Sequence, residues 1–497
     1  MRQTVALGIM LAGHNVLLTG QAGSGKTFLL SEFIRRAKAS DKSVAVTATT
    51  GLAATHLGGS TIHAWSGIGV HDALPNSFFD NLSKTRADTI KKADVLIIDE
   101  ISMLHHYRLD MVNEVLKKVR KNEAPFGGVQ IILCGDFFQL PPVNRGEASG
   151  NFVVHADSWH ELNPTICYLS EQHRQNDDDL LSVLSAMRAG DLRQKHGKIL
   201  FSRIGAELTG DITELHTTNL DVDSINQAAL EKIDGEAHWY TMLSTGSANY
   251  VDTLKRSCLA PEALVLKKGA LVMFIKNSID KKYVNGSLGV IEGFEELTDY
   301  PEVRLQNGKL VVASPETWEL RDGDKKRASL TQLPLRLAWA ITVHKSQGMT
   351  LDAARIDLRR AFVEGMGYVA LSRVRSLATL SLAGINRMAL KVSNDALTIE
   401  TMLQKQSAAA AEHFKNLAVD LKAPAKEKPK SNWAEKLTTM RQTHPNAFKP
   451  WSEADDAKLL ELFKAKQTID SLSQTFGRHP GSIRSRLKKH LGEEISI

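Results

Sequence analysis

Cysteine is scarce in this chain of 497 residues, which has only Cys134, Cys167 and Cys258. The three lie far apart and form no Cys-x-x-Cys pair, so they indicate neither a disulfide framework nor a zinc site. A reducing, intracellular compartment is the expectation that follows, and we assign the protein to the cytoplasm.

Long apolar segments are also missing. No uninterrupted apolar run approaches the roughly 20 residues that a membrane-spanning helix needs. The segment from Met1 to His14 carries one basic residue and a short apolar stretch, which superficially resembles a signal peptide. It runs directly into the strand of the first motif, however, so cleavage would destroy that motif. We interpret this segment as a helix of the fold.

An excess of charge is absent from most of the chain. The formal net charge of +6 arises entirely from residues 422–497, since acidic and basic residues balance over the remainder. This distribution favours a polyanionic partner for the C-terminal part. A basic segment that is merely solvated is the alternative.

Short apolar runs alternate with helical patterns or polar loops, which predicts parallel α/β sheets with buried strands. The first set of predicted strands is Val16–Thr19, Val44–Ala48, Val95–Ile98 and Val129–Cys134, and the second is Ile212–His216, Ala270–Ile275, Leu337–Ile341, Ala354–Leu358 and Thr379–Ala383.

Two later segments have a different texture. Between Lys276 and Leu333, short alternating runs with Asn-Gly turn signals predict a small β-barrel or hairpin insertion. Residues 422–430 are a linker by composition. Trp451–Gly492 predicts three helices, the last one opened by Pro480 and basic on its outer side, a pattern typical of a helix-turn-helix or Myb-like module. Duplex DNA binding through Arg484, Arg486, Lys488 and Lys489 is the interpretation we favour, and a protein-docking bundle is the alternative.

A phosphate-binding loop is the most specific motif. The segment from Gly20 to Thr27 fits Gly-x-x-x-x-Gly-Lys-[Ser/Thr], with a strand before it and a helical pattern after it. Backbone N–H groups of such a loop, and the positive end of the following helix, bind phosphate oxygens. We expect Lys26 to neutralise the β- and γ-phosphates of ATP, and the Thr27 hydroxyl to bind Mg²⁺. The residues assigned to nucleotide binding are Gly20, Ala22, Gly23, Ser24, Gly25, Lys26 and Thr27.

Two further strand ends carry polar residues suited to phosphoryl transfer. Asp99 and Glu100 follow the third predicted strand, at the edge where α/β proteins bind ligands. Asp99 is expected to hold Mg²⁺ and Glu100 to polarise the attacking water. Gln139 follows the fourth strand, and its amide can both donate and accept, so it is suited to sensing the γ-phosphate. A surface turn is the alternative for the acidic pair.

Two arginines in the second half lie in suggestive positions. Arg174 follows an apolar run, and Arg373 precedes the last predicted strand. A mobile arginine from a second domain can stabilise transition-state charge and couple domain closure to hydrolysis. A surface salt bridge is the alternative for either residue.

The order of these motifs resembles that of superfamily 1B helicases, most closely the PIF-type (petite-integration-frequency) branch and more distantly the RecD-type group. The resemblance covers roughly residues 1–390. It rests on Gln3, 20–27, 47–65, 99–103, 135–143, 174–175, 338–351 and 368–373, among which Gly-Asp-Phe-Phe-Gln-Leu-Pro-Pro and Thr-Val-His-Lys-Ser-Gln-Gly are highly specific.

The resemblance implies roles for several residues. Gln3 is expected to recognise adenine, Gln139 to couple nucleotide state to movement, and Arg174 and Arg373 to face the γ-phosphate from the second RecA-like domain. Residues expected along a single-stranded DNA track are Thr61, His63, His344 and Ser346. The N-terminal extension of longer family members is not expected here.

The resemblance also implies an architecture of two tandem RecA-like P-loop domains, an α/β fold, with a small SH3-like β insertion in the second. The expected boundaries are 1–165 for the first domain, 166–276 and 333–390 for the second, 277–332 for the insertion, 391–421 for a helical extension, 422–447 for a linker and 448–497 for the C-terminal module.

The expected function is an ATP-dependent DNA helicase that uses Mg²⁺ and moves 5′ to 3′ on single-stranded or forked DNA, in repair, replication or recombination or, as in part of the family, telomere maintenance. We expect a monomer, associated with the nucleoid if the source is bacterial. The alternatives are a nucleic-acid-binding regulator that uses ATP as a switch without unwinding, and an RNA helicase.

Overall fold

The computed structural model describes residues 1–69, 72–142, 151–172, 177–209, 212–258, 260–276, 278, 282–283, 285–305, 307–322, 325–421, 440–447 and 449–491. The chain divides into two compact units, Met1–Ala423 and Pro424–Ile497. No helix within the described ranges is both long enough and apolar enough to cross a membrane.

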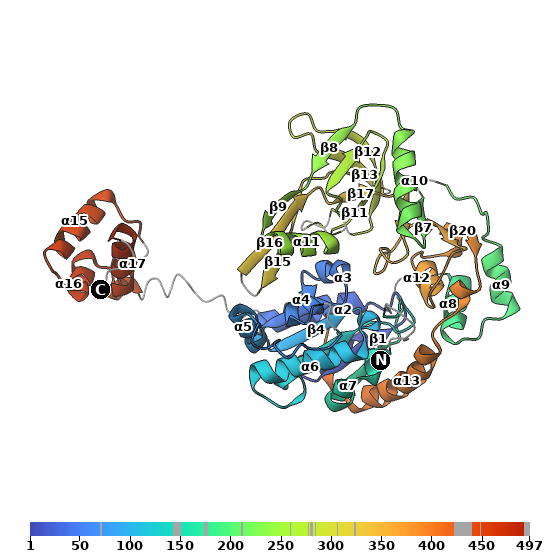
Figure 1. Ribbon diagram of the computed structural model, residues 1–497, viewed down its shortest axis with the longest axis horizontal. Helices are drawn as coiled ribbons and strands as arrows, with labels where there is room; N and C mark the ends of the chain where they lie inside the picture. Colours follow the sequence, from blue (N-terminus) through green and yellow to red (C-terminus); the bar gives the residue numbers. More distant parts are fainter. Residues whose placement is uncertain are drawn as a thin grey trace. The chain divides into compact units, whose positions relative to one another are not determined.

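A six-stranded parallel sheet forms the centre of what we call the first lobe (Figure 1). Every residue of its strands β1 and β4 is buried, as expected for strands covered on both faces. In the order β3-β2-β4-β5-β1-β6, the strands are Ser60–Thr61, Val44–Ala48, Val95–Asp99, Gln130–Cys134, Val16–Gly20 and Thr165–Leu169, and helices α1 to α7 are Gln3–Leu11, Lys26–Ala39, Gly51–His56, Ile62–Ser66, Lys84–Lys92, His106–Arg120 and Asp157–Leu162.

A second, four-stranded parallel sheet forms the centre of the second lobe. The prediction of an α/β fold with two parallel sheets is therefore confirmed. In the order β18-β7-β19-β20, the strands are Ala340–Thr342, Thr213–His216, Ala354–Leu358 and Leu380–Ile385, and helices α8, α9, α10 and α12 are Asp178–Arg188, Gln194–Phe201, Asn219–Glu231 and Met366–Leu371.

An antiparallel region lies between β7 and β18 in the sequence, and it begins earlier than predicted. The run Ala270–Ile275, expected in the second parallel sheet, forms β11 and pairs antiparallel with β12 and β17. A buried apolar strand looks the same in either kind of sheet, because periodicity does not identify the neighbouring strand. The elements are β8 (His238–Thr241), β9 (Leu243–Gly246), α11 (Ala248–Ser257), β10 (Ala263–Leu266), β11 (Leu271–Phe274), β12 (Leu288–Phe294), β13 (Pro301–Leu305), β14 (Leu310–Val312), β15 (Glu316–Asp322), β16 (Lys325–Gln332) and β17 (Leu335–Leu337).

The predicted boundary at residue 165 is wrong by one strand. Strand β6, Thr165–Leu169, pairs in parallel with β1 and so completes the first sheet. Helix α13, Asn394–His413, also returns to the first lobe, where the Ser407 hydroxyl accepts a hydrogen bond from the Tyr168 N–H of β6 (Figure 1). The helical extension that we predicted over residues 391–421 thus packs against the first lobe, which contains the phosphate loop.

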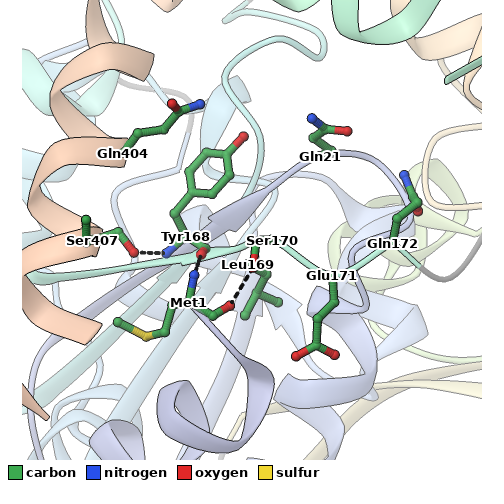
Figure 2. A pocket seen from close by; sticks show the side chains of 10 residues that line it. Met1, Gln21, Tyr168, Leu169, Ser170, Glu171, Gln172, Gln404 and Ser407 are labelled. Carbon is green, nitrogen blue, oxygen red and sulfur yellow. Dashed lines mark hydrogen bonds between the residues drawn. The ribbon is translucent and has the colours of Figure 1, made fainter. Parts of the chain in front are cut away.

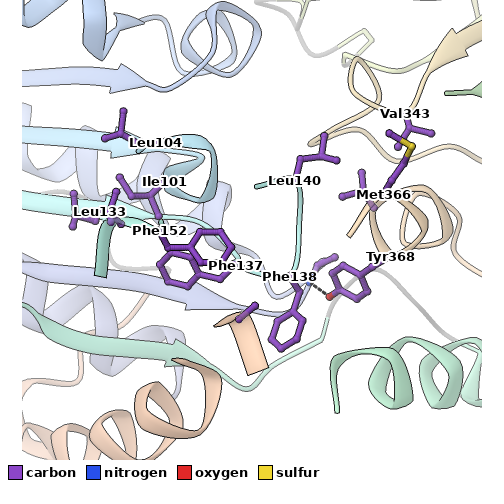
Figure 3. Close-up of a cluster of buried hydrophobic side chains, with 14 of the residues drawn as sticks. Ile101, Leu104, Leu133, Phe137, Phe138, Leu140, Phe152, Val343, Met366 and Tyr368 are labelled. Carbon is purple, nitrogen blue, oxygen red and sulfur yellow. Dashed lines mark hydrogen bonds between the residues drawn. The ribbon is translucent and has the colours of Figure 1, made fainter. Parts of the chain in front are cut away.

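One hydrophobic cluster joins the two lobes. Phe137, Phe138 and Leu140, in the loop after β5, belong to the same buried cluster as Met366 and Tyr368 of the second lobe (Figure 3). Because both lobes contribute side chains to it, a rearrangement of the lobes must repack these side chains.

The second unit contains the three predicted helices, drawn in red in Figure 1. Helix α15 begins after Ser452, whose hydroxyl accepts from the Asp455 N–H in a capping box. Helix α16 is followed by Gly477, which caps it in the left-handed conformation. The helices are α15 (Glu453–Lys464), α16 (Ile469–Phe476) and α17 (Pro480–Leu491), and the buried core is Leu459, Leu472, Phe476, Ile483 and Leu487.

Candidate active site

The phosphate loop connects β1 to α2 at the carboxyl edge of the first sheet. Gly20 has φ of 143°, and a Cβ there would lie 2.7 Å from the Leu169 carbonyl oxygen. Gly25, with φ of 84°, directly precedes the first turn of α2. These positions require glycine because the chain must turn tightly beside β6 and leave its N–H groups free for an anion.

Two side chains of this loop are suited to binding phosphate. The Lys26 ammonium donates to the carbonyl oxygens of Gly20 and Gln21, at 2.8 and 3.0 Å. The Ser24 hydroxyl is buried and finds no hydrogen-bond partner among the described residues. A buried hydroxyl without a partner is costly, so its place in a glycine-lined loop fits a phosphate group well.

Asp99 and Glu100 lie at the end of β4. Burial raises the pKa of Asp99, against the opposing effects of a Cys134 hydrogen bond, the Glu100 N–H and the Lys26 charge. Burial also raises the pKa of Glu100 to about 7, with a further increase from Asp99, whereas Lys26 and Arg373 oppose the shift. A carboxylate with a pKa near neutrality is suited to accepting a proton from water.

The second lobe reaches this carboxylate through a residue that sequence reasoning missed. The Gln347 amide donates to Glu100 Oε2 at 2.9 Å and to Gln139 Oε1 at 3.3 Å. Gln347 lies in the Thr-Val-His-Lys-Ser-Gln-Gly string, so the motif itself was the signal. Gln139 is 7% exposed and shares the Gln347 amide donor with Glu100.

Of the two arginines predicted to face the γ-phosphate, the structure describes Arg373. Arg373 is 1% exposed, and its guanidinium donates to the carbonyl oxygens of Val369, Ser346 and Met349. Its charge lowers the pKa of Glu100, which places it within electrostatic range of the site. Arg174 lies outside the described residues.

An open cavity of about 350 Å³ adjoins the phosphate loop (Figure 2). Gln21 of the loop, Glu171 and Gln172 border it on one side, and Gln404 of α13 borders it on the other. Gln3 does not line this cavity. Its amide instead donates to the Ser24 carbonyl at 3.0 Å, so Gln3 stabilises the conformation of the phosphate loop.

Thr27 and Asp99 offer the hydroxyl and carboxylate oxygens that Mg²⁺ prefers. The Lys26 charge lowers the pKa of Asp99, so this carboxylate lies near the start of α2. Thr27 is exposed at the same helix end. Across the described part of the chain, no three His, Cys, Asp or Glu side chains gather to hold a metal. Mg²⁺ in phosphate sites is usually bound by one or two protein oxygens together with substrate phosphates and water, and Thr27 and Asp99 fit that pattern.

The residues predicted along a DNA track are held in different ways. Thr61 caps α4 by accepting from the Ala64 N–H. His63 Nε2 lies 2.9 Å from a guanidinium nitrogen of Arg108, which in turn pairs with Asp72 at 3.3 Å. Because arginine can only donate, the His63 ring is a neutral acceptor, and its Nε2 is already engaged within the protein.

His63 makes the stability of the fold depend on pH. Burial, with contributions from Arg108 and His105, lowers the pKa of His63 to about 4. In the unfolded chain His63 binds a proton near pH 6.5, so it contributes stability above that pH, and this contribution is lost as the pH falls towards 4.

Between pH 7 and pH 5 we expect the protonation of unfolded His63 to lower the free energy of unfolding by at most about 2 kcal/mol. Urea unfolding of His63→Gln should show a smaller loss than the wild type, and exposed His160→Gln should match the wild type. Equal losses in all three proteins would contradict the assignment.

His344 and Ser346 are less accessible than predicted. The His344 ring stacks on Phe362, with 6.1 Å between ring centroids, and burial lowers its pKa. Ser346 is fully buried, and its hydroxyl donates to the Val343 carbonyl at 2.8 Å. A DNA contact through the Ser346 hydroxyl is therefore wrong for this arrangement, because helical-turn geometry directs that hydroxyl inwards.

Comparison with known proteins places this geometry in a family. Residues 2–196 match the PIF1-like helicase model and residues 249–294 match the 2B domain of DNA helicase Pif1. An ATP-dependent DNA helicase Pif1 of Psychrobacter sp. (strain PRwf-1) is 40% identical over 480 residues, covering 84% of this chain and 73% of the relative. The chain belongs to the Pif1-like helicase family.

Solved structures of Pif1 helicases agree with this assignment. The Bacteroides sp. enzyme in complex with ADP-AlF4 superposes with a TM-score of 0.71 at 30% identity, covering 82% of this chain and 97% of that one. The Candida albicans enzyme gives 0.68 at 33% identity, covering 81% and 98%. The ATP-dependent DNA helicase PIF1 of Xenopus laevis is 36% identical, and the chain spans 64% of its length. The match to the 2B domain begins at residue 249, which agrees with the early start of the antiparallel region.

The C-terminal unit lies outside the residues matched by the Pif1-like family models. Arg484, Lys488 and Lys489 are exposed on α17. Arg486 differs, because its guanidinium pairs with both carboxylate oxygens of Asp456 and lies 5.7 Å from the Trp451 ring. The expectation that Arg486 faces outwards is wrong, since i+3 spacing from Ile483 places it beside the apolar face of the helix.

Proposed function

We propose that this chain moves 5′ to 3′ along single-stranded DNA and separates the strands of a forked duplex, with Mg²⁺-bound ATP as its fuel. Membership of the Pif1-like family makes it an ATP-hydrolysing DNA helicase. The observation that carries the mechanism is the contact of Gln347, from the second lobe, with both Glu100 and Gln139 of the first. Hydrolysis at Glu100 is thereby tied to the position of the other lobe.

The residues divide the chemistry among themselves. Backbone N–H groups of 20–27, together with Lys26, bind the triphosphate, and Glu100 takes a proton from the attacking water. Thr27 and Asp99 would hold Mg²⁺, which would supply charge neutralisation at the phosphates. Arg373 stabilises the negative charge of the transition state from the second lobe. The cavity bordered by Gln21 and Gln404 is where we place the nucleobase.

Movement follows from the change in phosphate charge during the cycle. Nucleotide binding favours closure of the lobes around Lys26 and Arg373, and loss of the γ-phosphate weakens that closure. If the two lobes hold single-stranded DNA with affinities that alternate between the states, each cycle advances the strand. Similar Bacteroides structures have been solved with single-stranded DNA.

A comparison of substrates tests this function. We expect ATPase activity to rise strongly with single-stranded DNA and weakly with RNA, and a 5′-tailed duplex to be unwound while a 3′-tailed duplex is not. Unwinding of only the 3′-tailed duplex would refute the polarity. ATP turnover that ignores nucleic acid would favour the ATP-switched regulator, and stronger stimulation by RNA would favour an RNA helicase.

For the C-terminal unit we propose binding to the phosphate backbone of duplex DNA through Arg484, Lys488 and Lys489. Arg484 and Lys488 are four residues apart on α17 and therefore share a face. Cationic side chains on one helix face after a helix–turn connection suit a DNA groove. The guanidinium groups of Arg478 and Arg486 lie against the Trp451 ring, and these contacts hold the buried side of α17 in place.

Salt dependence distinguishes such binding from a solvated basic surface. Replacing Arg484 and Lys488 with alanine should lower duplex affinity and reduce the slope of log K against log salt by about 2, about 1 for each contact. Exposed Lys458 and Lys464 on α15 provide the matched double variant, whose slope should stay closer to that of the wild type. ATPase activity should persist in both. Identical slopes for the two double variants, measured by fluorescence anisotropy, would contradict the proposed surface.

A further inference from the structure

A buried arginine, Arg188, lies outside all of the motifs that were recognised in the sequence. Arg188 is the last residue of α8 and is 5% exposed. Its guanidinium donates to both carboxylate oxygens of Asp136, at 2.7 and 2.8 Å. It also donates to Glu400 Oε1 at 3.0 Å and to the Tyr168 hydroxyl at 3.1 Å. Burying an arginine is costly unless its donors are paired; Nη1 and Nη2 are paired here, whereas Nε finds no partner among the described residues.

Two of the groups around Arg188 belong to the loop that carries Gln139. Asp136 begins the loop after β5 that carries Gln139 three residues later. The ring of Phe138, in the same loop, lies 4.2 Å from the Arg188 guanidinium carbon. Paired charges lower the pKa of Asp136 despite its burial, so the carboxylate stays ionised. Arg188 therefore fixes the loop on which Gln139 stands.

The same guanidinium reaches the phosphate loop through a tyrosine. Arg188 donates to the Tyr368 hydroxyl at 3.1 Å, and that hydroxyl also accepts the Ala22 N–H at 3.2 Å. Tyr368 stands in α12, and Figure 3 shows its ring beside Phe138, between the lobes. Arg373 follows Tyr368 by five residues. A backbone N–H of the phosphate loop is thus connected to the helix that leads to the catalytic arginine.

We propose that Arg188 is a positioning residue for ATP hydrolysis. With Tyr368 it holds three parts in register: the phosphate loop at Ala22, the Gln139 loop at Asp136, and α12 ahead of Arg373. The inference rests on the proposed function, since it assigns to Arg188 the alignment of groups that act on ATP. If nucleotide binding shifts the Ala22 N–H, the Tyr368 hydroxyl that accepts its hydrogen bond shifts with it. The Arg188–Asp136 pair, which is bonded to the same hydroxyl, then adjusts as well, so the displacement affects both lobes.

The chemistry requires arginine at this position. The Arg188 Nη1 contacts both Asp136 oxygens and the Tyr368 hydroxyl, while its Nη2 reaches the Tyr168 hydroxyl and Glu400, so two nitrogens in one rigid plane hold the set. Lysine keeps the charge but presents one nitrogen, so it cannot hold the same set of partners in a fixed geometry. Arg188→Lys should therefore preserve charge balance in the interior and lose alignment.

Two variants and one control test the proposal. Arg188→Lys replaces two bonding nitrogens by one, and Tyr368→Phe removes one hydroxyl without changing the packing of the ring. Arg120→Lys is the control, because Arg120 donates to the carbonyl oxygens of Gly127, Ile90, Lys91 and Ala93 within the first lobe and touches no part of the site. Each variant is made in the full chain.

The readouts are kcat and KM for ATP at saturating single-stranded DNA, the Kd of a fluorescent ADP analogue, and the melting temperature. We expect kcat to fall about 10- to 100-fold in Arg188→Lys and Tyr368→Phe. KM and Kd should stay within about threefold of the wild type. In Arg120→Lys the melting temperature should fall while kcat is retained. The double variant should lose little more than the worse single one, because both act in one network.

The outcomes separate the two proposals. If DNA does not stimulate the wild type, the proposed function fails. If it does, and both variants keep kcat within about twofold of the wild type, the inference about Arg188 is overturned alone. A rise in KM equal to the loss in kcat/KM, with kcat retained, would also overturn it, since it would assign Arg188 to nucleotide binding. Should Arg188→Lys fail to fold, Tyr368→Phe alone decides the question.

Discussion

Replacing Arg373 with alanine is expected to lower kcat for DNA-stimulated ATP hydrolysis by about 10³-fold or more. The guanidinium supplies positive charge from the second lobe and acts on the same environment as Glu100, whose pKa it lowers. Arg373 would neutralise the charge that redistributes over the phosphoryl and leaving-group oxygens in the transition state, so the loss should appear in kcat. Affinity for ADP should change by no more than about threefold.

Arg373 also has structural bonds, which the experiment must separate from catalysis. It donates to three carbonyl oxygens of the second lobe, so alanine leaves those acceptors without a partner. Arg373→Lys keeps a charge and serves as the second variant. Arg193→Ala, which removes an exposed arginine whose side chain pairs with nearby Asp191, is the control. Turnover close to the wild-type rate in a folded Arg373→Ala protein would refute the catalytic role.

Replacing Lys26 with alanine is expected to lower kcat/KM for ATP by about a thousandfold and to abolish unwinding. Lys26 is the positive charge of the phosphate loop, and its ammonium already lies against Gly20 and Gln21. The fold should persist, because these bonds are to carbonyl oxygens at a solvent-accessible edge. Loss of the ammonium also removes a charge that lowers the pKa of both Asp99 and Glu100.

The control for Lys26 is exposed Lys38, at the other end of α2. Lys38→Ala should hydrolyse ATP and unwind DNA at wild-type rates. Circular dichroism and the melting temperature establish that Lys26→Ala is folded. If that variant, once folded, hydrolysed ATP within about tenfold of the wild type, the phosphate loop would not be the site of turnover.

Local patterns account for most of what could be predicted. Strands β2 and β19 begin and end at the predicted residues, and β1, β4 and β5 differ by one residue at one end. The cap at Ser452 and the left-handed Gly477 are likewise set by residues within a few positions of the helix ends. These features depend on neighbours a few residues away, through apolar runs, capping side chains and glycine conformations.

Predictions failed where a residue depends on distant partners. The run at residues 270–275 was a correct strand assigned to the wrong sheet, and β6 was placed in the wrong lobe. Ser346 was given to DNA but is buried. Arg188 went unnoticed although it follows Leu180 and Leu184 at helical spacing, where a single charge on an apolar face is the signal to look for.

The sequence by itself determined the chemistry of this protein, because a phosphate loop and an acidic strand end are short segments whose backbone geometry is set locally. Tertiary structure alone decided which groups meet: Gln347 at Glu100, Arg188 at Asp136 and Tyr368, and α13 against β6. Residues 52 to 247 positions apart form these contacts, and only the packing of sheets and lobes, which no local pattern encodes, brings them together.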